Sequence, residues 1–200
     1  MKYLYGASGH GKVIFDILHY RGEEEIIFVD DNDSIHEFVN KKVIKSINID
    51  SKIPIIISIG NNFIRKRISE KLTNPFLNAI HLSANISEFT QIGKGIAIMA
   101  GAAINIDSKI GNHCIINTNA SIDHDCIIED FVHISPNATL AGNVQVGEGT
   151  WIGAGATIIQ GIKIGKWVTV GAGSVVLENI PDYAVAVGVP AKIIKYNDKK

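Results

Sequence analysis

One short segment of the chain places an imidazole between two carboxylates. Residues 122–126 read Ile-Asp-His-Asp-Cys, so Asp123 and Asp125 flank His124. A carboxylate close to an imidazole stabilises the protonated form and raises its pKa, which makes the neutral ring a stronger base. Because a lone exposed histidine is usually uninformative, the neighbouring carboxylates decide the interpretation. The segment predicts a general base at His124.

A glycine-rich loop near the N-terminus has the features of a phosphate site. Residues 6–12 read Gly-Ala-Ser-Gly-His-Gly-Lys, after the apolar stretch Lys2–Tyr5 and before a run of helical spacing from Val13 to about Tyr20. Backbone N–H groups and the helix dipole at such a junction favour phosphate. The spacing is Gly-x-x-Gly-x-Gly and not the dinucleotide-binding Gly-x-Gly-x-x-Gly, so an ordinary tight turn remains an alternative.

Two further apolar stretches end in polar residues. Asp30 and Asp31 follow the first of them, and Gly60 and Asn61 follow the other, Ile53–Ile59. An acidic group at the end of the second strand commonly binds a ribose or a base, whereas the alternative for the aspartates is a solvated turn. The order of strand, glycine loop, helix and strand predicts a small parallel, Rossmann-like α/β unit over residues 1–79. Three polar strand ends on one rim favour a nucleotide ligand there.

From residue 80 onwards the chain repeats every six residues. All seventeen positions taken in steps of six from Ile80 to Val176 are aliphatic. The position four residues after each aliphatic is mostly small or β-branched, and Cys114 and Cys126 fall there as core residues. Glycine often follows the aliphatic directly, where it would permit the turn dihedrals. Each hexapeptide therefore supplies one short strand and one turn, and only stacked coils can bury the aliphatic side chains.

This hexapeptide segment resembles the left-handed parallel β-helix of the hexapeptide-repeat acyltransferases. In that family three hexapeptides form one triangular coil of 18 residues, and the active unit is usually a trimer. The resemblance implies an all-β left-handed parallel β-helix over residues 80–181, with between five and six coils. Residues 182–200 would form a C-terminal tail, in which the Gly-Val-Pro-Ala-Lys of residues 188–192 is the usual closing motif of such enzymes.

The N-terminal motifs make the resemblance more specific. The glycine loop, the Val-Asp-Asp-Asn of residues 29–32 and the Ile-Gly-Asn-Asn-x-x-Arg of residues 59–65, followed by the β-helix, resemble the bacterial nucleotide-sugar acetyltransferases. This family includes UDP-4-amino-sugar and GDP-perosamine N-acetyltransferases and relatives that O-acetylate sialic acid. The resemblance implies that the N-terminal unit binds a nucleotide sugar, with the glycine loop at the diphosphate and the aspartate pair at the base. The residues to which it assigns substrate binding are Gly6, Ser8, Gly9, His10, Asp30, Asp31, Gly60 and Asn61.

The same resemblance assigns roles within the β-helix. Residues 122–126 match the family signature Ile-x-His-(Glu/Asp)-Cys, so His124 takes the role of general base and Asp125 that of tuning its basicity. Some relatives have Glu where this chain has Asp, which leaves the reach of the shorter carboxylate open. Asn117 matches an active-site asparagine of the family. The residues expected to contact acetyl-CoA are His133, Ala154 and Ala172.

These motifs predict an acetyl-CoA-dependent N-acetyltransferase for surface glycan synthesis. Its acceptor would be the 4-amino group of a nucleotide-linked 4-amino-4,6-dideoxy sugar, with UDP favoured over GDP. The amine must lose a proton as it attacks the thioester, and a neutral histidine can accept that proton near pH 7. The sites would lie between neighbouring β-helices of a homotrimer. Two alternatives remain: O-acetylation, for example of sialic acid, and a non-catalytic, nucleotide-sugar-binding trimeric scaffold.

Composition argues against several other classes of protein. Nineteen basic residues against twenty acidic ones give a net charge of −1, so no basic surface indicates nucleic-acid binding. Two cysteines cannot form a disulfide framework, which favours a reducing, cytoplasmic setting. No membrane span or signal peptide is expected, because no apolar run is long enough. No metal is expected either, because His113, His124 and His133, at turn-prone or outward positions, lack the spacing of a three-histidine site.

Overall fold

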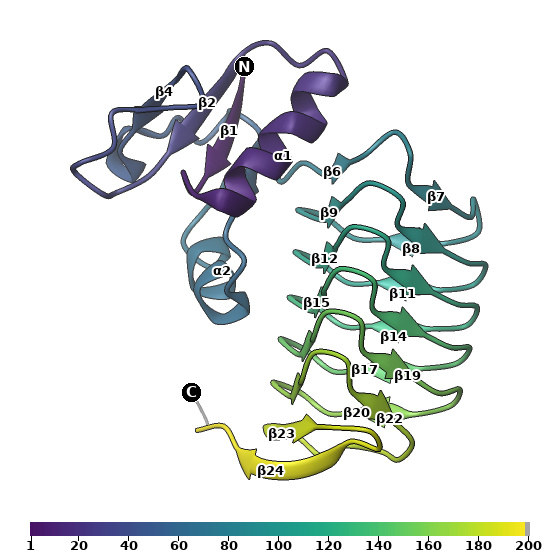
Figure 1. Ribbon diagram of the computed structural model, residues 1–200. Helices are drawn as coiled ribbons and strands as arrows, with labels where there is room; N and C mark the ends of the chain where they lie inside the picture. Colours follow the sequence, from purple (N-terminus) through teal and green to yellow (C-terminus); the bar gives the residue numbers. More distant parts are fainter. Residues whose placement is uncertain (199–200) are drawn as a thin grey trace.

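The N-terminal unit is a small sheet with helices packed beside it (Figure 1). The computed structural model describes residues 1–198 of the chain. The elements of this unit are β1 (Lys2–Tyr5), α1 (Gly9–Tyr20), β2 (Ile26–Val29), β3 (Glu37–Phe38), β4 (Lys41–Ile44), the short 3-10 helix η1 (Ser46–Asn48), β5 (Ile55–Ile57) and α2 (Asn62–Ser69). The strands lie in the order β3-β4-β2-β1-β5, and all neighbours are parallel except the β3–β4 hairpin.

Apolar strands and one amphipathic helix build the core of this unit. Leu4, Phe28 and Ile56 are completely buried in β1, β2 and β5, and α1 packs Ile14 and Ile17 into the same core. Each fully buried side chain of this size contributes roughly 1.5–3 kcal/mol by its removal from water. The predicted α/β unit is therefore present, and the carboxyl ends of β1, β2 and β5 form one rim.

Two local features of this unit differ from the prediction. Helix α1 begins at Gly9 rather than at Val13, with Ser8 extended at the N-cap position, so that the glycine loop is partly helical. The β3–β4 hairpin escapes prediction because its turn residues Val39 and Asn40 have φ of 52° and 53°. Valine rarely adopts that conformation, so the sequence carries no turn signal there.

The second unit is a β-helix of short parallel strands (Figure 1). Its strands are β6 (Ala79–Ile80), β7 (Asn85–Ile86), β8 (Gln91–Ile92), β9 (Ala97–Ile98), β10 (Ala103–Ile104), β11 (Lys109–Ile110), β12 (Ile115–Ile116), β13 (Ser121–Ile122), β14 (Ile127–Ile128), β15 (His133–Ile134), β16 (Thr139–Leu140), β17 (Gln145–Val146), β18 (Trp151–Ile152), β19 (Thr157–Ile158), β20 (Lys163–Ile164), β21 (Thr169–Val170), β22 (Val175–Val176), β23 (Ala184–Val187) and β24 (Lys192–Tyr196). The first face contains β6, β9, β12, β15, β18, β21, β23 and β24; the second contains β7, β10, β13, β16, β19 and β22; the third contains β8, β11, β14, β17 and β20. The antiparallel pair β23–β24 closes the end of the first face.

The coil period and the core agree with the prediction. Paired strands join residues one 18-residue coil apart, such as Ile116 with Ile134 and Ile122 with Leu140. Strands β6 to β20 make five complete coils, and β21 and β22 begin a sixth. In the steps of six from residue 98 to residue 176, each aliphatic is at most 3% exposed. Both cysteines are free and buried in this core, as predicted.

Glycines at the corners have two roles, one of which corrects the prediction. Gly111 and Gly153, directly after an aliphatic, do not have positive φ. They permit close stacking, because a Cβ would lie 2.7 Å from the backbone nitrogen of Asp130 at Gly111, and 2.5 Å from that of Ala172 at Gly153. The left-handed conformation lies two residues later, as at Gly155 with φ of 65°. Glycine, asparagine and aspartate fill most of these later positions because they tolerate it.

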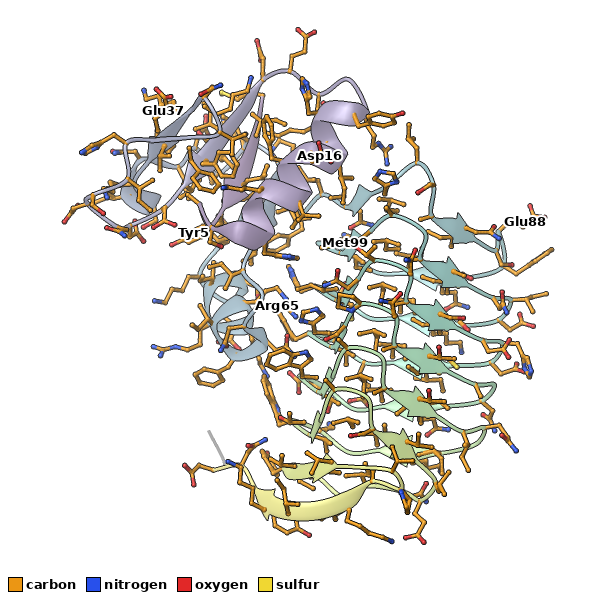
Figure 2. The ribbon with its side chains drawn as sticks, viewed as in Figure 1. Tyr5, Asp16, Glu37, Arg65, Glu88 and Met99 are labelled. Carbon is orange, nitrogen blue, oxygen red and sulfur yellow. The ribbon has the colours of Figure 1, made fainter. Side chains whose placement is uncertain are left out.

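The N-terminal unit packs against the first face of the β-helix. Apolar residues of α1 and β1 share a buried cluster with Ala97, Met99 and Ile115 of the β-helix. Farther along the face, α2 docks through Arg65, which is 1% exposed (Figure 2). The edge between the second and third faces therefore lies on the side of the β-helix opposite the N-terminal unit. Across residues 1–198, none of the helices combines the length and apolar character needed to cross a membrane.

Gly111→Ala should lower the free energy of unfolding by about 1–3 kcal/mol, because the new methyl group would overlap the backbone of the next coil. Gly9→Ala is the matched control, since no atom outside its own helix lies within 4 Å of a Cβ there. Urea denaturation of both variants and the parent chain measures the difference. Equal stability of the two variants would show that the coil contact does not require glycine.

Candidate active site

His124 lies on the edge between the second and third faces, in the turn from β13 to β14. Its side chain is 55% exposed, and its Nδ1 lies 2.7 Å from Asp125 Oδ2. Asp125 has φ of 61°, a left-handed conformation that aspartate tolerates. The shorter carboxylate therefore does reach the imidazole, which answers the question that the sequence left open. With Nδ1 held by Asp125, Nε2 is the atom that can accept a proton.

The acidic residues beside His124 set its protonation and its backbone. The hydrogen bond that the His124 ring donates to Asp125, and after it the charge of Asp123, raise the pKa of the His124 imidazole above its usual value. Asp123 Oδ1 also accepts hydrogen bonds from the His124 N–H and from the side-chain amide of Asn105, both at 2.8 Å. Asn105 is one coil earlier, so the turn is anchored to the neighbouring coil.

Gly142 forms a seat for the His124 ring that the sequence motifs do not indicate. It lies one coil after His124, and a Cβ there would be 2.5 Å from Cε1 and 2.6 Å from Nε2 of the imidazole. Gly142 does not have positive φ, so the backbone conformation does not require glycine. Glycine is required here because any side chain at position 142 would overlap the His124 ring. The one signal that points to this residue is the coil period, which stacks positions 124 and 142.

The structure brings the predicted nucleotide-binding residues together at the rim of the N-terminal sheet. Asp30 accepts the backbone N–H groups of Ala7 and Asn32, both at 2.9 Å, so it shapes the glycine loop. Asp31 accepts the Tyr5 hydroxyl at 3.0 Å and a backbone N–H at 2.8 Å. Both carboxylates are thus already engaged by the protein, and each retains lone pairs for a ligand.

The remaining residues of the rim divide into exposed and buried groups. Gly6 is buried, whereas Ser8 and Gly9 are exposed at the start of α1. Asn61 caps α2, because its Oδ1 accepts the N–H of the residue three positions later at 3.0 Å. His10 is mostly buried and its Nε2 has no hydrogen-bond partner among the described residues. Burial, and after it the charge of Arg65, lower the pKa of His10 to about 4.

Asn117 and His133 meet the N-terminal unit on the first face. The side-chain amide of Asn117 lies 3.1 Å from His133 Nε2, and the backbone of Gly60 acts to raise the pKa of the His133 ring. The ring stacks against Trp151 at 5.8 Å between centroids. Burial lowers the pKa of His133 to about 3, followed by the charges of Arg65 and of His10. We call His10, Gly60, Asn117 and His133 the interdomain cluster.

Within one chain the candidate residues form two separate groups. The interdomain cluster and the nucleotide rim lie on the side of the first face, whereas His124 and Asp125 lie on the opposite edge. Ala154 and Ala172 are exposed in the turns that follow β18 and β21. They are one coil apart on the edge between the first and second faces, which is also the edge of Asn117. One chain alone therefore does not bring the His124 imidazole to the rim of its own N-terminal sheet.

His113 differs from the prediction that it is outward. It is 5% exposed, with its ring stacked on Phe131 at 5.2 Å and edge-to-face against Phe76 at 4.4 Å. This packing fills the corner on which α2 docks. Among residues 1–198, no three His, Cys, Asp or Glu side chains lie close enough together to hold a metal ion.

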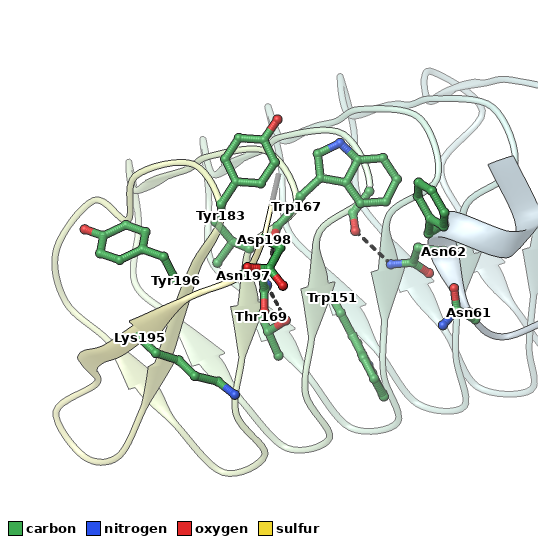
Figure 3. Close-up of a pocket in the computed structure, with 13 residues that line it drawn as sticks. Asn61, Asn62, Trp151, Trp167, Thr169, Tyr183, Lys195, Tyr196, Asn197 and Asp198 are labelled. Atoms are coloured by element: carbon green, nitrogen blue, oxygen red, sulfur yellow. Dashed lines mark hydrogen bonds between the residues drawn. The ribbon is translucent and has the colours of Figure 1, made fainter. Parts of the chain in front are cut away.

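A cavity of about 370 Å³ lies beside the interdomain cluster (Figure 3). It lies between the start of α2 and the C-terminal strands, and aromatic rings form much of its wall. Asn61 and Trp151 connect it to the rim and to His133. The other lining residues include Phe63, Trp167, Tyr183, Lys195 and Tyr196. The hexapeptide pattern does not predict this cavity, because it depends on how the N-terminal unit docks.

Comparisons with known proteins match both units. Residues 3–72 match the family model of the PglD N-terminal domain, and residues 107–142 and 143–178 match that of the bacterial transferase hexapeptide. UDP-N-acetylbacillosamine N-acetyltransferase of Bacillus subtilis (strain 168) is 42% identical over 107 residues, which is 48% of this chain and 49%, or about half, of that relative. PerB from Caulobacter crescentus, solved with CoA and GDP-perosamine, is 37% identical over 96% of each chain, with a TM-score of 0.89. The acetyltransferase domain of PglB from Neisseria gonorrhoeae FA1090 is 37% identical over 96% of this chain and 98% of that chain, with a TM-score of 0.92.

The chain belongs to the hexapeptide-repeat acetyltransferases with a PglD N-terminal domain. The family predicted from the glycine loop, the strand ends and the repeat is therefore confirmed. The fold class is also confirmed, with an α/β unit followed by a left-handed β-helix. The roles of the individual site residues in this acetyltransferase stay predictions.

Asp125→Asn should lower the pKa of His124, because the hydrogen bond to this carboxylate is the largest cause of the raised value. Asparagine tolerates the same left-handed backbone, so the turn is preserved. Asp107→Asn is the matched control, since Asp107 has the same conformation one coil earlier. An NMR titration of the His124 ring measures both. An unchanged midpoint in Asp125→Asn, or equal shifts in the two variants, would contradict the assigned cause.

Gly142→Ala should displace the His124 ring from its seat and break its hydrogen bond to Asp125. The substitution adds no backbone strain, because φ is not positive at this position. The His124 titration midpoint should therefore fall, as it does when the carboxylate is removed, while the fold is retained. A midpoint equal to that of the parent chain would show that the ring does not depend on Gly142.

Proposed function

We propose that this chain is an acetyl-CoA-dependent N-acetyltransferase acting on a nucleotide-linked amino sugar for surface glycan synthesis. The observation that carries the proposal is the match of both units, over 96% of each chain, to PerB solved with CoA and GDP-perosamine. The acceptor is the 4-amino group of a 4-amino-4,6-dideoxy sugar. UDP is favoured over GDP, since the name of the Bacillus relative contains a UDP sugar. Both thiols are free, which agrees with the cytoplasmic setting proposed from the cysteine number.

The proposed reaction needs a base and no covalent enzyme intermediate. The sugar nitrogen attacks the thioester carbonyl of acetyl-CoA, the C–N bond forms, and the C–S bond breaks as the thiolate of CoA leaves. His124 Nε2 accepts the proton that the nitrogen loses, and the departing thiolate takes up a proton to give free CoA. An N–H donor stabilises the negative charge on the carbonyl oxygen during the attack. Asp125 stabilises the imidazolium that forms.

The nucleotide sugar is placed on the rim of the N-terminal sheet. The first N–H groups of α1, at Gly9 and His10, have no intrahelical acceptor. They form a helix N-terminus, which favours phosphate. Gly6 and Ser8 complete this loop at the diphosphate. At the other strand ends the proposed substrate-binding residues are Asp30, Asp31, Gly60 and Asn61.

Acetyl-CoA is placed along the edge between the first and second faces. Ala154 and Ala172 are exposed there, and their small side chains leave the backbone of two successive coils open to the pantetheine arm. Asn117 lies on the same edge, and the ring of His133 borders it on the first face. This path directs the thioester toward the interdomain cluster.

The base is supplied by a neighbouring copy in a homotrimer. His124 lies opposite the face that carries the N-terminal unit, so a second chain must bring it to the rim. Phe89, Ile106 and Ile127 are exposed around this edge, and such apolar groups favour cover by another protein surface. A closed threefold arrangement would repeat the same contact three times and form three equivalent sites.

A thiol-release assay with acetyl-CoA and a panel of UDP- and GDP-linked amino sugars tests the proposed activity. Turnover should require a 4-amino sugar nucleotide and should fall by roughly 100-fold or more in His124→Ala. Activity should be lost as the pH falls through the raised pKa of His124, because only the neutral ring accepts a proton. Turnover of sialic acid with inert amines would establish O-acetylation instead. A chain that binds the sugar nucleotide but releases no thiol would be a scaffold.

Mixing two inactive variants tests the shared site. His124→Ala lacks the base, and Gly9→Asp places a carboxylate at the proposed diphosphate site. Refolded or coexpressed mixtures should recover about a quarter of the parental activity. Half of the chains have an intact base, and each of these meets a neighbour with an intact rim about half of the time. Each variant alone, or both mixed without subunit exchange, should stay inactive. A mixture that recovers nothing after exchange would indicate that each site is built within one chain.

A further inference from the structure

The junction between the two units contains a buried cation with only neutral partners. Arg65 projects from α2 into the junction (Figure 2), where it is 1% exposed. Its guanidinium donates to the backbone carbonyls of His113, Phe131, Ile59 and Gly60 and to the side-chain oxygen of Asn62, at 2.8–3.2 Å. No carboxylate pairs with it among these contacts, so its positive charge is uncompensated locally. Such a charge opposes any second positive charge nearby.

Two imidazoles of the interdomain cluster lie within the influence of this charge. Burial is the main cause of the low pKa of His10 and of His133, and the charge of Arg65 comes second at both. His10 and His133 also disfavour each other's protonation. Within residues 1–198, the charged and titratable groups that act on His133 are Arg65 of α2 and His10 of α1. Both rings are therefore neutral wherever the chain is folded near neutral pH.

The hydrogen bonds around His133 require one tautomer. The N–H of Thr118 donates to Asn117 Oδ1 at 2.8 Å, so the amide oxygen of Asn117 faces the backbone and its NH₂ faces His133. His133 Nε2 must then accept at 3.1 Å, which a protonated nitrogen cannot do. The proton of the neutral ring is left on Nδ1.

We propose that His133 is a positioning residue, which holds the amide of Asn117 in place through an unprotonated Nε2. The Asn117 amide then presents its second N–H in a fixed direction. Within residues 1–198 this N–H has no acceptor. Asn117 lies on the edge along which we propose that acetyl-CoA binds. The fixed N–H serves as a donor to the acyl carbonyl oxygen during the attack. This last step rests on the proposed function, whereas the tautomer does not.

The tautomer can be measured without any substrate. Nitrogen-15 NMR of the imidazoles should show His133 protonated on Nδ1 and unchanged from about pH 5 to pH 8. His124 is the internal control, because its pKa is raised and its resonances should move in this range. A His133 ring protonated on Nε2, or one that titrates together with His124, would overturn the proposal. This result stands whether or not the chain transfers acetyl groups.

The charge of Arg65 is tested in the same spectra. Arg65→Met removes the charge, so the resonances of His133 should begin to move at a higher pH than in the parent chain. Arg65→Lys keeps the charge and should leave them unchanged. Where Arg65→Met does not fold, Arg65→Gln takes its place, because it also removes the charge and keeps two side-chain N–H donors. A His133 ring with the same titration in the uncharged variant as in the parent chain would contradict the role of the charge.

A double-mutant cycle tests whether His133 acts through Asn117. His133→Leu should lower kcat by about tenfold with little change in KM for acetyl-CoA, because the amide loses its direction. His133→Gln should restore most of the rate, since its side-chain oxygen can accept from the Asn117 amide. In an Asn117→Ala background, His133→Leu should cost nothing more. Additive losses, or a loss confined to the KM for acetyl-CoA, would make His133 an independent ligand of the cofactor.

Discussion

The architecture of both the core and the candidate site follows from the parallel pairing of strands one 18-residue coil apart. Each coil places its residues directly over those of the coil before, so the side chains form columns along the faces and edges. Inside the β-helix, the columns of aliphatic and small residues exclude water. Outside it, the same registration places His124 over Gly142 and the ring of His133 beside that of Trp151. A rigid set of columns can therefore hold functional side chains without long loops.

The chain places histidines in two opposite electrostatic environments. On the exposed edge a carboxylate raises the pKa of His124, whereas at the junction of the units burial and a nearby guanidinium lower that of His133. In the proposed mechanism the first environment prepares His124 to accept a proton, and the second keeps His133 a neutral hydrogen-bond acceptor. In the proposed assembly the two environments meet where one copy of the chain places its edge against the junction of another. Assembly would then be a condition for the chemistry as well as for stability.

Much of the architecture follows from the sequence, because one spacing determines it. The step of six predicts the inward column, the number of coils and the burial of both cysteines. Glycines follow several of these aliphatics, and the sequence pattern predicts that turn geometry requires them. The structure shows that close stacking of the coils requires them instead. The His124–Asp125 pair is also visible, because its members are adjacent in the chain.

Contacts between distant segments are what the sequence conceals. The role of Arg65 depends on carbonyls from both units, and carbonyls carry no residue signature. His113 has the position of an outward residue, yet the docking of α2 buries it against two phenylalanine rings. The tautomer of His133 follows from a backbone N–H at residue 118, which no motif shows. Each of these depends on how the N-terminal sheet sits on the first face.

In the proposed assembly, His124 of one copy acts on a sugar held by the next. A crystal structure of the assembled protein with CoA and a UDP-linked 4-amino sugar measures this directly. We expect His124 Nε2 of one copy at about 3 Å from the amino nitrogen of a sugar whose nucleotide lies on the neighbouring copy's rim. A sugar amine bound far from every His124 ring, or next to the ring of the chain that holds its nucleotide, would contradict it.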